Sequence, residues 1–429
     1  MSVVFYSRDA GIIRGAEYVQ YFCLLQDCSH TNKKMKKSLL ALMLGGLALG
    51  TTEFVMMGIL PDIAKDLDIS IPVAGHLISA YALGVVIGAP LLVILAGTYP
   101  PKKILLALVM MITGFNALSM LAPGYDLLFL TRLLSGLPHG AFFGVGAVVA
   151  SRLADKGKEA QAVSIMFAGL TVANLAGVPL GTYIGHNIDW RYAFVLIAFI
   201  GLVTLLCIQL WMPRLEAKSD GSLKEQMKFF RSADAWLIIC ITAIGTGGLF
   251  CWISYIAPLL TEVSGFAAES VPYILAFAGL GMVFGNILGG WLADRFSPAK
   301  TSAALLVAMA ISLILVYFVS YNKAFALVMT FLTGGIAFAL AAPIQVLMIQ
   351  AAKGAEMLAA AVSQACFNLG NALGAYLGGL PIAAGLGYTA PEWVGVLMAL
   401  TGALAAAGLI RIQQKRETEA PEPTPQTVY

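Results

Sequence analysis

Apolar residues occur along this chain in long runs that short polar segments separate. A helix needs about 20 residues to cross the roughly 30 Å hydrocarbon core of a bilayer. Because hydrocarbon offers no partner to backbone N–H and C=O groups, each such run is predicted to be a helix that satisfies its own peptide bonds. The pattern predicts an all-α membrane protein with twelve transmembrane helices. They lie near residues 38–60, 73–96, 104–122, 127–150, 161–184, 192–212, 235–257, 272–293, 302–320, 324–348, 357–384 and 392–411.

Residue types in the first half of the chain recur in the second half after a constant step of 197 positions. One offset holds over about a hundred residues, so the connecting loops match in length as well. Parallel internal repeats are typical of transporters built from two similar helical bundles, with a ligand site where the bundles face each other. The matching pairs include Gly84 with Gly281, Lys103 with Lys300, Asn174 with Asn371 and Gly181 with Gly378.

The repeat divides the chain into two six-helix bundles, residues 35–212 and 235–412, which the polar segment 213–234 connects. Residues 413–429 are rich in Pro, Glu and Thr and are predicted to be a disordered cytoplasmic tail. Residues 1–34 contain no span and no recognisable signal peptide. Since the segment from Met35 begins with charge followed by helix, we expect translation to start there, with a genuine cytoplasmic arm as the alternative.

Composition and charge narrow the class of protein. The chain is 59% hydrophobic and 11% charged, against about 25% charged residues in soluble domains, which excludes a soluble protein. Of the 26 Lys and Arg residues, twenty fall in the segments on one side of the predicted spans and three on the other. Basic residues stay on the cytoplasmic side, so both termini are predicted to be cytoplasmic, in a bacterial inner membrane.

No His-Cys cluster, phosphate-binding loop or nucleophile motif occurs in the sequence. We therefore expect no metal, no cofactor, no enzymatic activity and no nucleic-acid partner. An ATP-driven pump is disfavoured for the same reason.

Three ionisable side chains other than Tyr and Cys lie well inside the predicted spans, namely Glu53, Arg132 and His139. A charge in hydrocarbon is costly, so these residues are functional candidates by default. Glu53 lies seven residues before the end of the first span, and Arg132 lies five or six residues into the fourth. At ~1.5 Å per residue both lie roughly 8–11 Å below the outer surface, so they are predicted to pair if their helices face each other.

The Glu53 carboxyl is the candidate proton carrier, with Arg132 as its partner. Burial disfavours the ionised form of a carboxyl and a neighbouring Arg favours it, so the balance can allow proton exchange near neutral pH. The alternative is a permanent ion pair that fixes helix packing and never titrates. His139 lies seven residues after Arg132 on the same helical stripe. It is either a proton relay or a neutral side chain bonded to a backbone carbonyl or an Asn.

Small residues recur every four positions along the fifth span, at Gly169, Ala173, Gly177 and Gly181, and along the eleventh, at Gly374 and Gly378. This spacing lets helices approach closely. Pro179 removes one backbone hydrogen bond and is a candidate bending point. These residues are predicted to serve helix packing, which alternating access requires in any case.

Polar and aromatic side chains inside the spans are candidates for a substrate cavity. Amides suit the hydroxyl groups of a sugar, whereas aromatic faces suit a sugar ring or a hydrophobic drug, so the set does not choose between the two. The candidates are Asn116, Asn174, Phe250, Trp252, Tyr255, Gln345, Gln364, Asn368 and Asn371.

Four segments resemble motifs of one family: Gly88–Lys103, its duplicate Gly289–Lys300, Arg132-Leu-Leu-Ser-Gly136, and Gly169–Gly181. They are similar to the cytoplasmic gating loops, the membrane Arg motif and the antiporter motif of the major facilitator superfamily, in its twelve-span proton-coupled efflux branch. The resemblance covers Met35–Arg411, and Pro138–Gly146 is most like the arabinose or sugar efflux permeases.

The resemblance implies the major facilitator fold and a gating loop formed by Gly88, Lys102, Lys103, Asp294 and Arg295. The first copy departs from the family pattern, because Gly97 and Thr98 stand where an Asp-Arg pair is expected. Asp294 and Arg295 are therefore the fuller copy of the latch.

The predicted function is export of a small organic molecule by proton antiport with alternating access. The substrate is a sugar such as arabinose or its derivatives, or a drug-like compound, and the protein is expected to act as a monomer in the lipid bilayer. The alternatives are a non-transporting membrane sensor that keeps the fold, and sugar uptake by proton symport.

Overall fold

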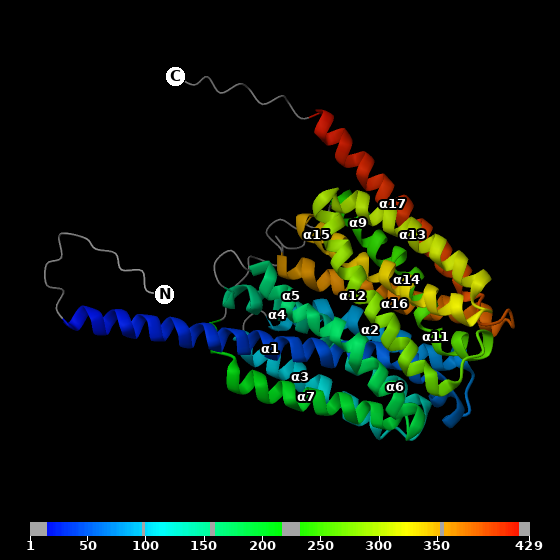
Figure 1. The fold of residues 1–429 in the computed structure, drawn as a ribbon, viewed down its shortest axis with the longest axis horizontal. Helices are drawn as coiled ribbons and strands as arrows, with labels where there is room; N and C mark the ends of the chain where they lie inside the picture. Colours follow the sequence, from blue (N-terminus) through cyan, green and yellow to red (C-terminus); the bar gives the residue numbers. More distant parts are fainter. Residues whose placement is uncertain (1–14, 97–98, 155–158, 217–231, 352–355, 420–429) are drawn as a thin grey trace.

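The structure, a computed structural model, describes residues 15–96, 99–154, 159–216, 232–351 and 356–419 (Figure 1). Within these ranges the chain is helical and contains no strand. Figure 1 shows the helices as one elongated bundle, with the first half of the chain below and the second half above. Most of the predicted linker 213–234 lies outside the described residues, as do Gly97 and Thr98.

The first half forms six membrane-length segments, of which the fifth is interrupted by a π-helical turn, η1. Pro101 begins the third segment, because the fixed φ and missing N–H of proline suit the first turn of a helix. The segments are α1 (Gly15–Asp66), α2 (Ile71–Ala96), α3 (Pro101–Met120), α4 (Tyr125–Leu153), α5 (Glu159–Val172) with η1 (Ala173–Gly177) and α6 (Val178–Asn187), and α7 (Arg191–Trp211).

The second half repeats this order with more interruptions. Ser297 and Asn322 cap two of its helices by accepting backbone N–H groups of the first turn. The elements are α9 (Ala233–Cys240), η3 (Ile241–Gly245), α10 (Gly247–Ile253), α11 (Ile256–Pro258) and η4 (Leu259–Val263), then η5 (Ala268–Ser270), α12 (Val271–Arg295), α13 (Pro298–Val319), α14 (Lys323–Ala339), α15 (Ala341–Ala351), α16 (Glu356–Ala383) and α17 (Pro391–Glu419).

Eleven helical segments of the described chain are long and apolar enough to cross a membrane, which confirms an all-α membrane protein. The predicted eleventh span corresponds to α16, which is not one of the eleven. Its polar residues Ser363, Gln364, Asn368 and Asn371 lower its hydropathy. The same residues place amides inside the bundle, as described below.

The two halves repeat the same helix contacts. In the first half α2 packs on α4 and α3 on α7, and in the second half α12 packs on α14 and α13 on α17. A Cβ added at Gly84 would lie 2.0 Å from the carbonyl oxygen of Leu133, and one added at Gly281 would lie 2.3 Å from that of Phe331. Glycine at these positions lets the helix backbones touch. The repeat in the sequence is therefore a repeat of structure.

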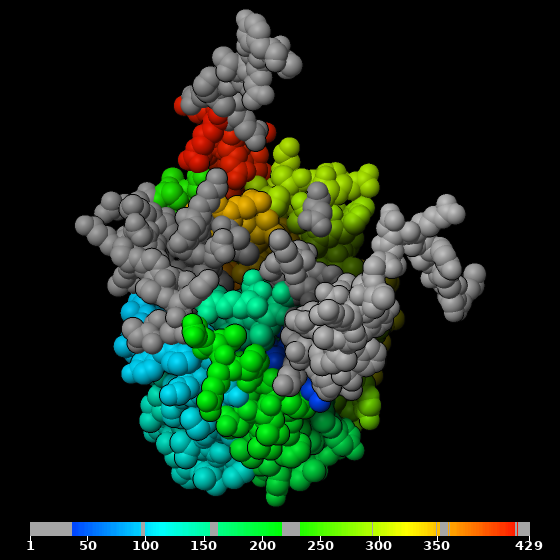
Figure 2. Space-filling view, turned by 90° about the vertical axis from the view of Figure 1, so that its left-hand side faces the viewer, coloured from blue at the N-terminus to red at the C-terminus, as the bar shows by residue number. Residues whose placement is uncertain are grey.

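Buried apolar side chains form three clusters that differ between the two ends of the bundle. One cluster joins both halves at the end where α1 finishes, and includes Phe54 and Tyr255. At the other end each half has its own cluster, around Phe142 in the first and Leu306 in the second, although Ala361 of α16 belongs to the first of these. We call the end of the bundle where α1 finishes, which holds the cluster with Phe54 and Tyr255, the closed end. The other is the basic end, which faces the viewer in Figure 2. Among the described residues it carries Lys102, Lys103, Arg152, Arg214, Arg295, Lys300, Arg411 and Arg416.

The C-terminal tail differs from its prediction. Helix α17 continues through Glu419, so residues 413–419 are helical, and the rest of the predicted disordered tail, residues 420–429, lies outside the described residues. Arg416 forms an ion pair with Asp234 of α9, with Nη1 2.5 Å from Oδ2. This contact ties the end of α17 to the start of the second bundle.

Candidate functional site

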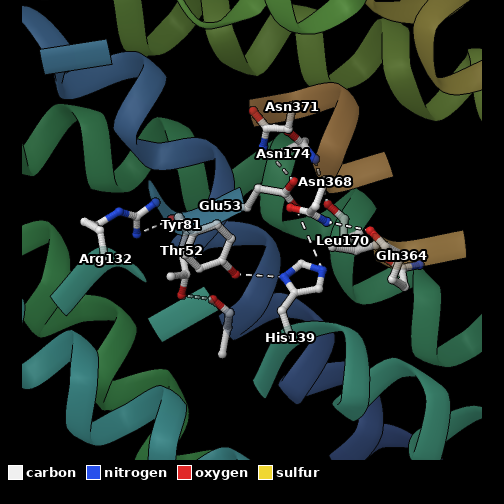
Figure 3. A network of polar contacts seen from close by, with 11 residues as sticks. Thr52, Glu53, Tyr81, Arg132, His139, Leu170, Asn174, Gln364, Asn368 and Asn371 are labelled. Atoms are coloured by element: carbon white, nitrogen blue, oxygen red, sulfur yellow. Dashed lines mark hydrogen bonds and ion pairs between the residues drawn. The ribbon is translucent and has the colours of Figure 1, made fainter. Parts of the chain in front are cut away.

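Glu53 lies on α1 and bonds across to the second half of the chain. Glu53 is 6% exposed, and its Oε1 accepts a hydrogen bond from Nδ2 of Asn371 on α16 at 3.1 Å (Figure 3). This is a contact between the two bundles. A buried carboxyl therefore connects the parts of the molecule that alternating access would move.

His139 lies beside Glu53 and is 1% exposed. Its Nε2 is 4.0 Å from Oε2 of Glu53, and its Nδ1 is 2.7 Å from the hydroxyl of Tyr81 on α2. If Tyr81 donates to Nδ1, the neutral imidazole carries its proton on Nε2, which faces Glu53. The structure therefore places His139 next to the predicted proton carrier. The other ring nitrogen of His139 contacts Tyr81, which the sequence analysis did not single out.

Arg132 does not form the predicted ion pair with Glu53. Its Nη1 donates to the backbone carbonyl of Thr52 at 3.0 Å, and its guanidinium carbon lies 4.4 Å from the centroid of the Tyr81 ring. Its Nε and Nη2 have no hydrogen-bond partner among the described residues. Depth in the membrane can be counted along a sequence, but the rotation of a helix cannot. In this structure the rotation of α4 directs the guanidinium of Arg132 to the carbonyl of Thr52, one residue before Glu53.

The amides of α16 lie with Glu53 and His139, as Figure 3 shows for Gln364, Asn368 and Asn371. Asn368 donates to the carbonyl of Gln364 at 3.1 Å, while the side-chain oxygens of Asn368 and Asn371 have no partner within the described chain. Asn174, in η1, donates to the carbonyl of Leu170 in its own helix at 3.0 Å. This group therefore retains two free amide acceptors.

Two other predicted amides lie elsewhere. Gln345 on α15 accepts a hydrogen bond from the hydroxyl of Ser363 at 2.8 Å. Asn116 donates to the carbonyl of Ile112 at 2.8 Å. It belongs to α3, which packs on α4 and α7. The structure therefore does not bring Asn116 to the group around Glu53.

The three predicted aromatic residues all belong to the apolar cluster at the closed end. Phe250 stacks on Phe54, next to Glu53 in sequence, with ring centroids 6.4 Å apart. Tyr255 donates its hydroxyl to the carbonyl of Ala375 at 2.6 Å. Trp252 lines a small cavity within the second bundle. Phe250 also packs on α16, since a Cβ added at Gly374 would lie 2.6 Å from its Cβ.

The predicted gating residues lie at the basic end, where the structure describes only some of their side chains. A Cβ added at Gly88 would lie 2.1 Å from the carbonyl oxygen of Leu137. The Nζ of Lys102 donates to the carbonyls of Gln209 and Met212, at 2.8 and 2.7 Å, and so caps the end of α7. Lys103 is exposed, and the guanidinium of Arg295 lies over the ring of Trp291 at 5.3 Å. The side chain of Asp294 is outside the described residues.

The glycines of the fifth and eleventh spans occupy close helix contacts. A Cβ added at Gly169 would lie 2.1 Å from the carbonyl oxygen of Met43, and those at Gly177 and Gly181 would meet Thr51 and Val55 of α1 at 2.3 and 2.6 Å. In the second half, Gly374 and Gly378 pack on α10 in the same way. Pro179 is near the start of α6, directly after the π-helical turn.

Sequence reasoning missed Tyr81 and the π-helical turn η1. Tyr81 is fully buried and contacts both Arg132 and His139. The available signal was a phenol within an apolar run, since a buried Tyr hydroxyl usually has a partner. A π-helical turn is frequent at functional sites, but a single sequence offers no pattern for it.

Comparison with known proteins gives consistent matches over nearly the whole chain. The sequence model of the Major Facilitator Superfamily matches residues 42–363 and 280–428. AraJ of Escherichia coli strain K12 is 42% identical over 390 residues, covering 91% of this chain and 98% of that protein. The inner membrane transport protein YdhP of the same strain is 39% identical over 366 residues, covering 85% and 94%.

A chloramphenicol resistance protein of Streptomyces lividans is 27% identical over 363 residues, covering 84% of this chain and 92% of that protein. Among solved structures, a bacterial homologue of the human lysosomal transporter Spinster, in an inward-facing and unoccupied conformation, superposes with a TM-score of 0.70. It is 17% identical and covers 91% of this chain and 99% of that one. At this identity the superposition establishes the fold alone.

Proposed function

Since this chain belongs to the Major Facilitator Superfamily, and is therefore a multi-pass membrane transporter and not an enzyme, we propose that it exports a small organic molecule in exchange for protons. Glu53 carries the proton, and the amides of α16 with Phe250 contact the substrate. The protein acts by alternating access of its two bundles, which the duplicated packing supports.

The hydrogen bond between Glu53 and Asn371 is the observation that carries this proposal. It joins the bundles at a group that can gain or lose a proton, with 3.1 Å between Oε1 and Nδ2. Hydrogen bonds to an ionised carboxylate are roughly twice as strong as neutral ones. Proton uptake by Glu53 therefore weakens the link between the bundles, and proton release restores it. A ligand shifts a conformational equilibrium only through such a difference between the two states.

His139 is the relay through which the proton reaches or leaves Glu53. Its Nε2 is 4.0 Å from the carboxyl, a distance that one water or a small shift of the ring bridges. Tyr81 fixes the orientation of the ring from the other side, through its contact of 2.7 Å with Nδ1. Arg132 holds Tyr81 and the carbonyl of Thr52, so it acts as a positioning residue for this group.

The free groups beside Glu53 favour a substrate that carries hydroxyl or amine donors. The side-chain oxygens of Asn368 and Asn371 are buried acceptors without a partner in the described chain, and a substrate donor would satisfy them. The stacked rings of Phe54 and Phe250 offer an apolar face next to them. A sugar satisfies both requirements, and so does a hydroxylated drug. The name of the Streptomyces lividans relative supports including the second class.

We infer that the protein lies in a bacterial inner membrane, with the basic end and both termini on the cytoplasmic side. The excess of Lys and Arg at that end supports this orientation. The apolar cluster at the closed end contains residues of both halves, whereas the clusters at the basic end are largely separate. In this state the Glu53 group would therefore exchange substrate with the cytoplasm.

The test is transport in proteoliposomes with an imposed pH gradient, screened with labelled arabinose, other sugars and chloramphenicol. Wild type should drive one of these compounds against its gradient. Glu53→Gln keeps an acceptor for Asn371 but cannot be ionised, so exchange of labelled for unlabelled substrate should continue while gradient-driven accumulation is lost.

Glu262→Gln is the matched control, because Glu262 is an exposed acid on η4. It should leave both activities unchanged. Normal pH-driven accumulation by Glu53→Gln would overturn the assignment of the proton carrier. The sign of the imposed gradient that gives accumulation distinguishes export by antiport from uptake by symport.

A further inference from the structure

A second buried carboxyl, Glu392, lies in the first turn of α17 at the closed end. The residue is 1% exposed, and its Oε2 has no hydrogen-bond partner among the described residues. Its helix packs on α10, α13 and α16 within the second bundle, so Glu392 is not part of the group around Glu53.

The register between the segment η3–α10 and helix α17 can be followed from their glycines. A Cβ added at Gly402 would lie 2.4 Å from the Cα of Gly245. Towards the closed end, a Cβ added at Gly395 would lie 3.3 Å from the Cβ of Cys251. Between these two contacts the residue number rises from 245 to 251 along η3–α10 and falls from 402 to 395 along α17, so the two helices run antiparallel in close contact.

One further turn along each helix brings Ser254 opposite Glu392. Ser254 lies three residues after Cys251, still with helical backbone angles, and Glu392 lies three residues before Gly395. Ser254 is fully buried, and its hydroxyl also has no partner in the described chain. The register therefore places Ser254 and Glu392 at facing positions of the two helices, but no hydrogen bond joins them, since Oε2 of Glu392 is unpartnered as well.

The surroundings of this pair are apolar. Two sulfurs lie between the same helices, since the Sγ of Cys251 on α10 is 3.7 Å from the Sδ of Met398 on α17. An ionised carboxylate needs water, a cation or several donors to offset its desolvation, whereas a neutral carboxyl needs one acceptor. The start of α17 favours negative charge, but this contribution is smaller than the desolvation of a buried ion. The neutral form is therefore favoured while the closed end is packed.

Other titratable side chains do not compensate a charge on Glu392. Cys251 on α10 is within its electrostatic reach. On the other neighbouring helices, Tyr317 of α13 contacts Trp393, and Tyr376 of α16 contacts His76. No Lys, Arg or His of the described chain forms an ion pair with Glu392.

We propose that Glu392 is a second proton site, separate from Glu53. The carboxyl of Glu392 holds a proton while the closed end is packed, because no cation of the described chain pairs with it and no donor reaches its Oε2 to offset the cost of ionisation. It releases this proton to water when that end opens. The site thus makes opening of the closed end sensitive to pH, and it does not depend on Glu53 carrying the exchanged proton.

The test is labelling of the purified full-length protein in detergent with dicyclohexylcarbodiimide, which reacts with neutral carboxyls in apolar surroundings. The carboxyl proton passes to a carbodiimide nitrogen while the carboxyl oxygen bonds to the carbodiimide carbon, and the product rearranges to a stable N-acylurea. Mass spectrometry of peptides should locate this adduct on Glu392 at neutral pH. The exposed Glu262 should remain unlabelled, and Glu392→Gln should lose the adduct.

Infrared spectroscopy adds a readout that does not need Glu392→Gln to fold. The carbonyl stretch of a neutral carboxyl should be present at neutral pH in wild type, and it should remain in Glu53→Gln, in which the other buried carboxyl cannot contribute. Absence of an adduct on Glu392 even at mildly acidic pH would overturn the proposal. So would loss of the adduct on addition of Na⁺ or K⁺, which would indicate a metal cation site, and so would absence of the carbonyl band in Glu53→Gln. These outcomes are independent of transport by Glu53→Gln.

Discussion

Asn174 and Asn371 occupy equivalent positions in the two halves, 197 residues apart, yet only Asn371 bonds to Glu53. Asn174 donates to Leu170 in its own helix instead. The same step of 197 residues carries Glu53 to Phe250, so the second half has an aromatic ring where the first has a carboxyl. The duplicated scaffold is thus nearly symmetric, but its chemistry is not. In this site the carboxyl of Glu53 and the imidazole of His139 come from the first half, and the amides of α16 that lie beside them come from the second.

This asymmetry predicts different effects of removing the two amides. Asn371→Ala leaves Glu53 without its donor, and a hydrogen bond to a charged group contributes about 1.5–3 kcal/mol. We expect the initial rate of pH-driven transport in proteoliposomes to fall about tenfold or more, since 1.4 kcal/mol corresponds to a factor of about ten. Asn174→Ala is the matched control and should retain most of the rate. Equal losses in the two variants would contradict a specific role for the bond between the bundles.

Tyr81→Phe separates the two contacts of this side chain. The variant keeps the ring under Arg132 and loses the hydroxyl that contacts Nδ1 of His139. We expect a folded protein whose substrate exchange has an altered pH dependence, measured in proteoliposomes with equal pH on both sides. Tyr255→Phe loses a buried hydroxyl that bonds only to a backbone carbonyl, so its pH dependence should match wild type. An unchanged pH profile in Tyr81→Phe would remove Tyr81 from the proton pathway.

Arg132 should matter for folding as well as for transport. Its guanidinium contacts the carbonyl of Thr52 and the ring of Tyr81, and a desolvated cation–π contact contributes about 2 kcal/mol. Arg132→Ala should lower the yield of monodisperse protein and its melting temperature in detergent. Arg132→Lys keeps the charge but loses the planar donor, so its melting temperature should fall between those of wild type and Arg132→Ala. A wild-type melting temperature in Arg132→Ala would contradict the positioning role.

Close packing of the fifth span on α1 can be tested with one methyl group. Gly169→Ala places a Cβ 2.1 Å from the carbonyl oxygen of Met43, and overpacking of this kind costs about 1–3 kcal/mol. The melting temperature in detergent should fall. Gly114→Ala on α3 is the control, because nothing lies within 4 Å of its added Cβ. It should stabilise the helix by about 0.5–1 kcal/mol. A lower melting temperature for Gly114→Ala than for Gly169→Ala would refute the packing argument.

The membrane class and the helical fold were predictable because each rests on a strong physical constraint. Hydrocarbon forces every spanning segment to satisfy its own backbone, so apolar length alone indicates helices. The repeat was visible because close contacts such as Gly84 on Leu133 and Gly281 on Phe331 need glycine in both halves. The end of α17 was predicted less well. Its last residues are polar, and composition did not reveal that the helix continues past Arg416, which pairs with Asp234.

For the site, the sequence by itself indicated three ionisable groups well inside the predicted spans, Glu53, Arg132 and His139, because charge there is rare enough to be conspicuous. It did not single out Glu392, which is buried in the first turn of α17. Only the tertiary structure decided which groups meet. Glu53 bonds to Asn371, 318 residues away, and Arg132 bonds to a backbone carbonyl instead of the carboxyl. Counting residues fixes the depth of a side chain, but the direction in which it points depends on how helices rotate as they pack. That rotation is set jointly by all the neighbouring helices, and no single segment of the sequence contains it.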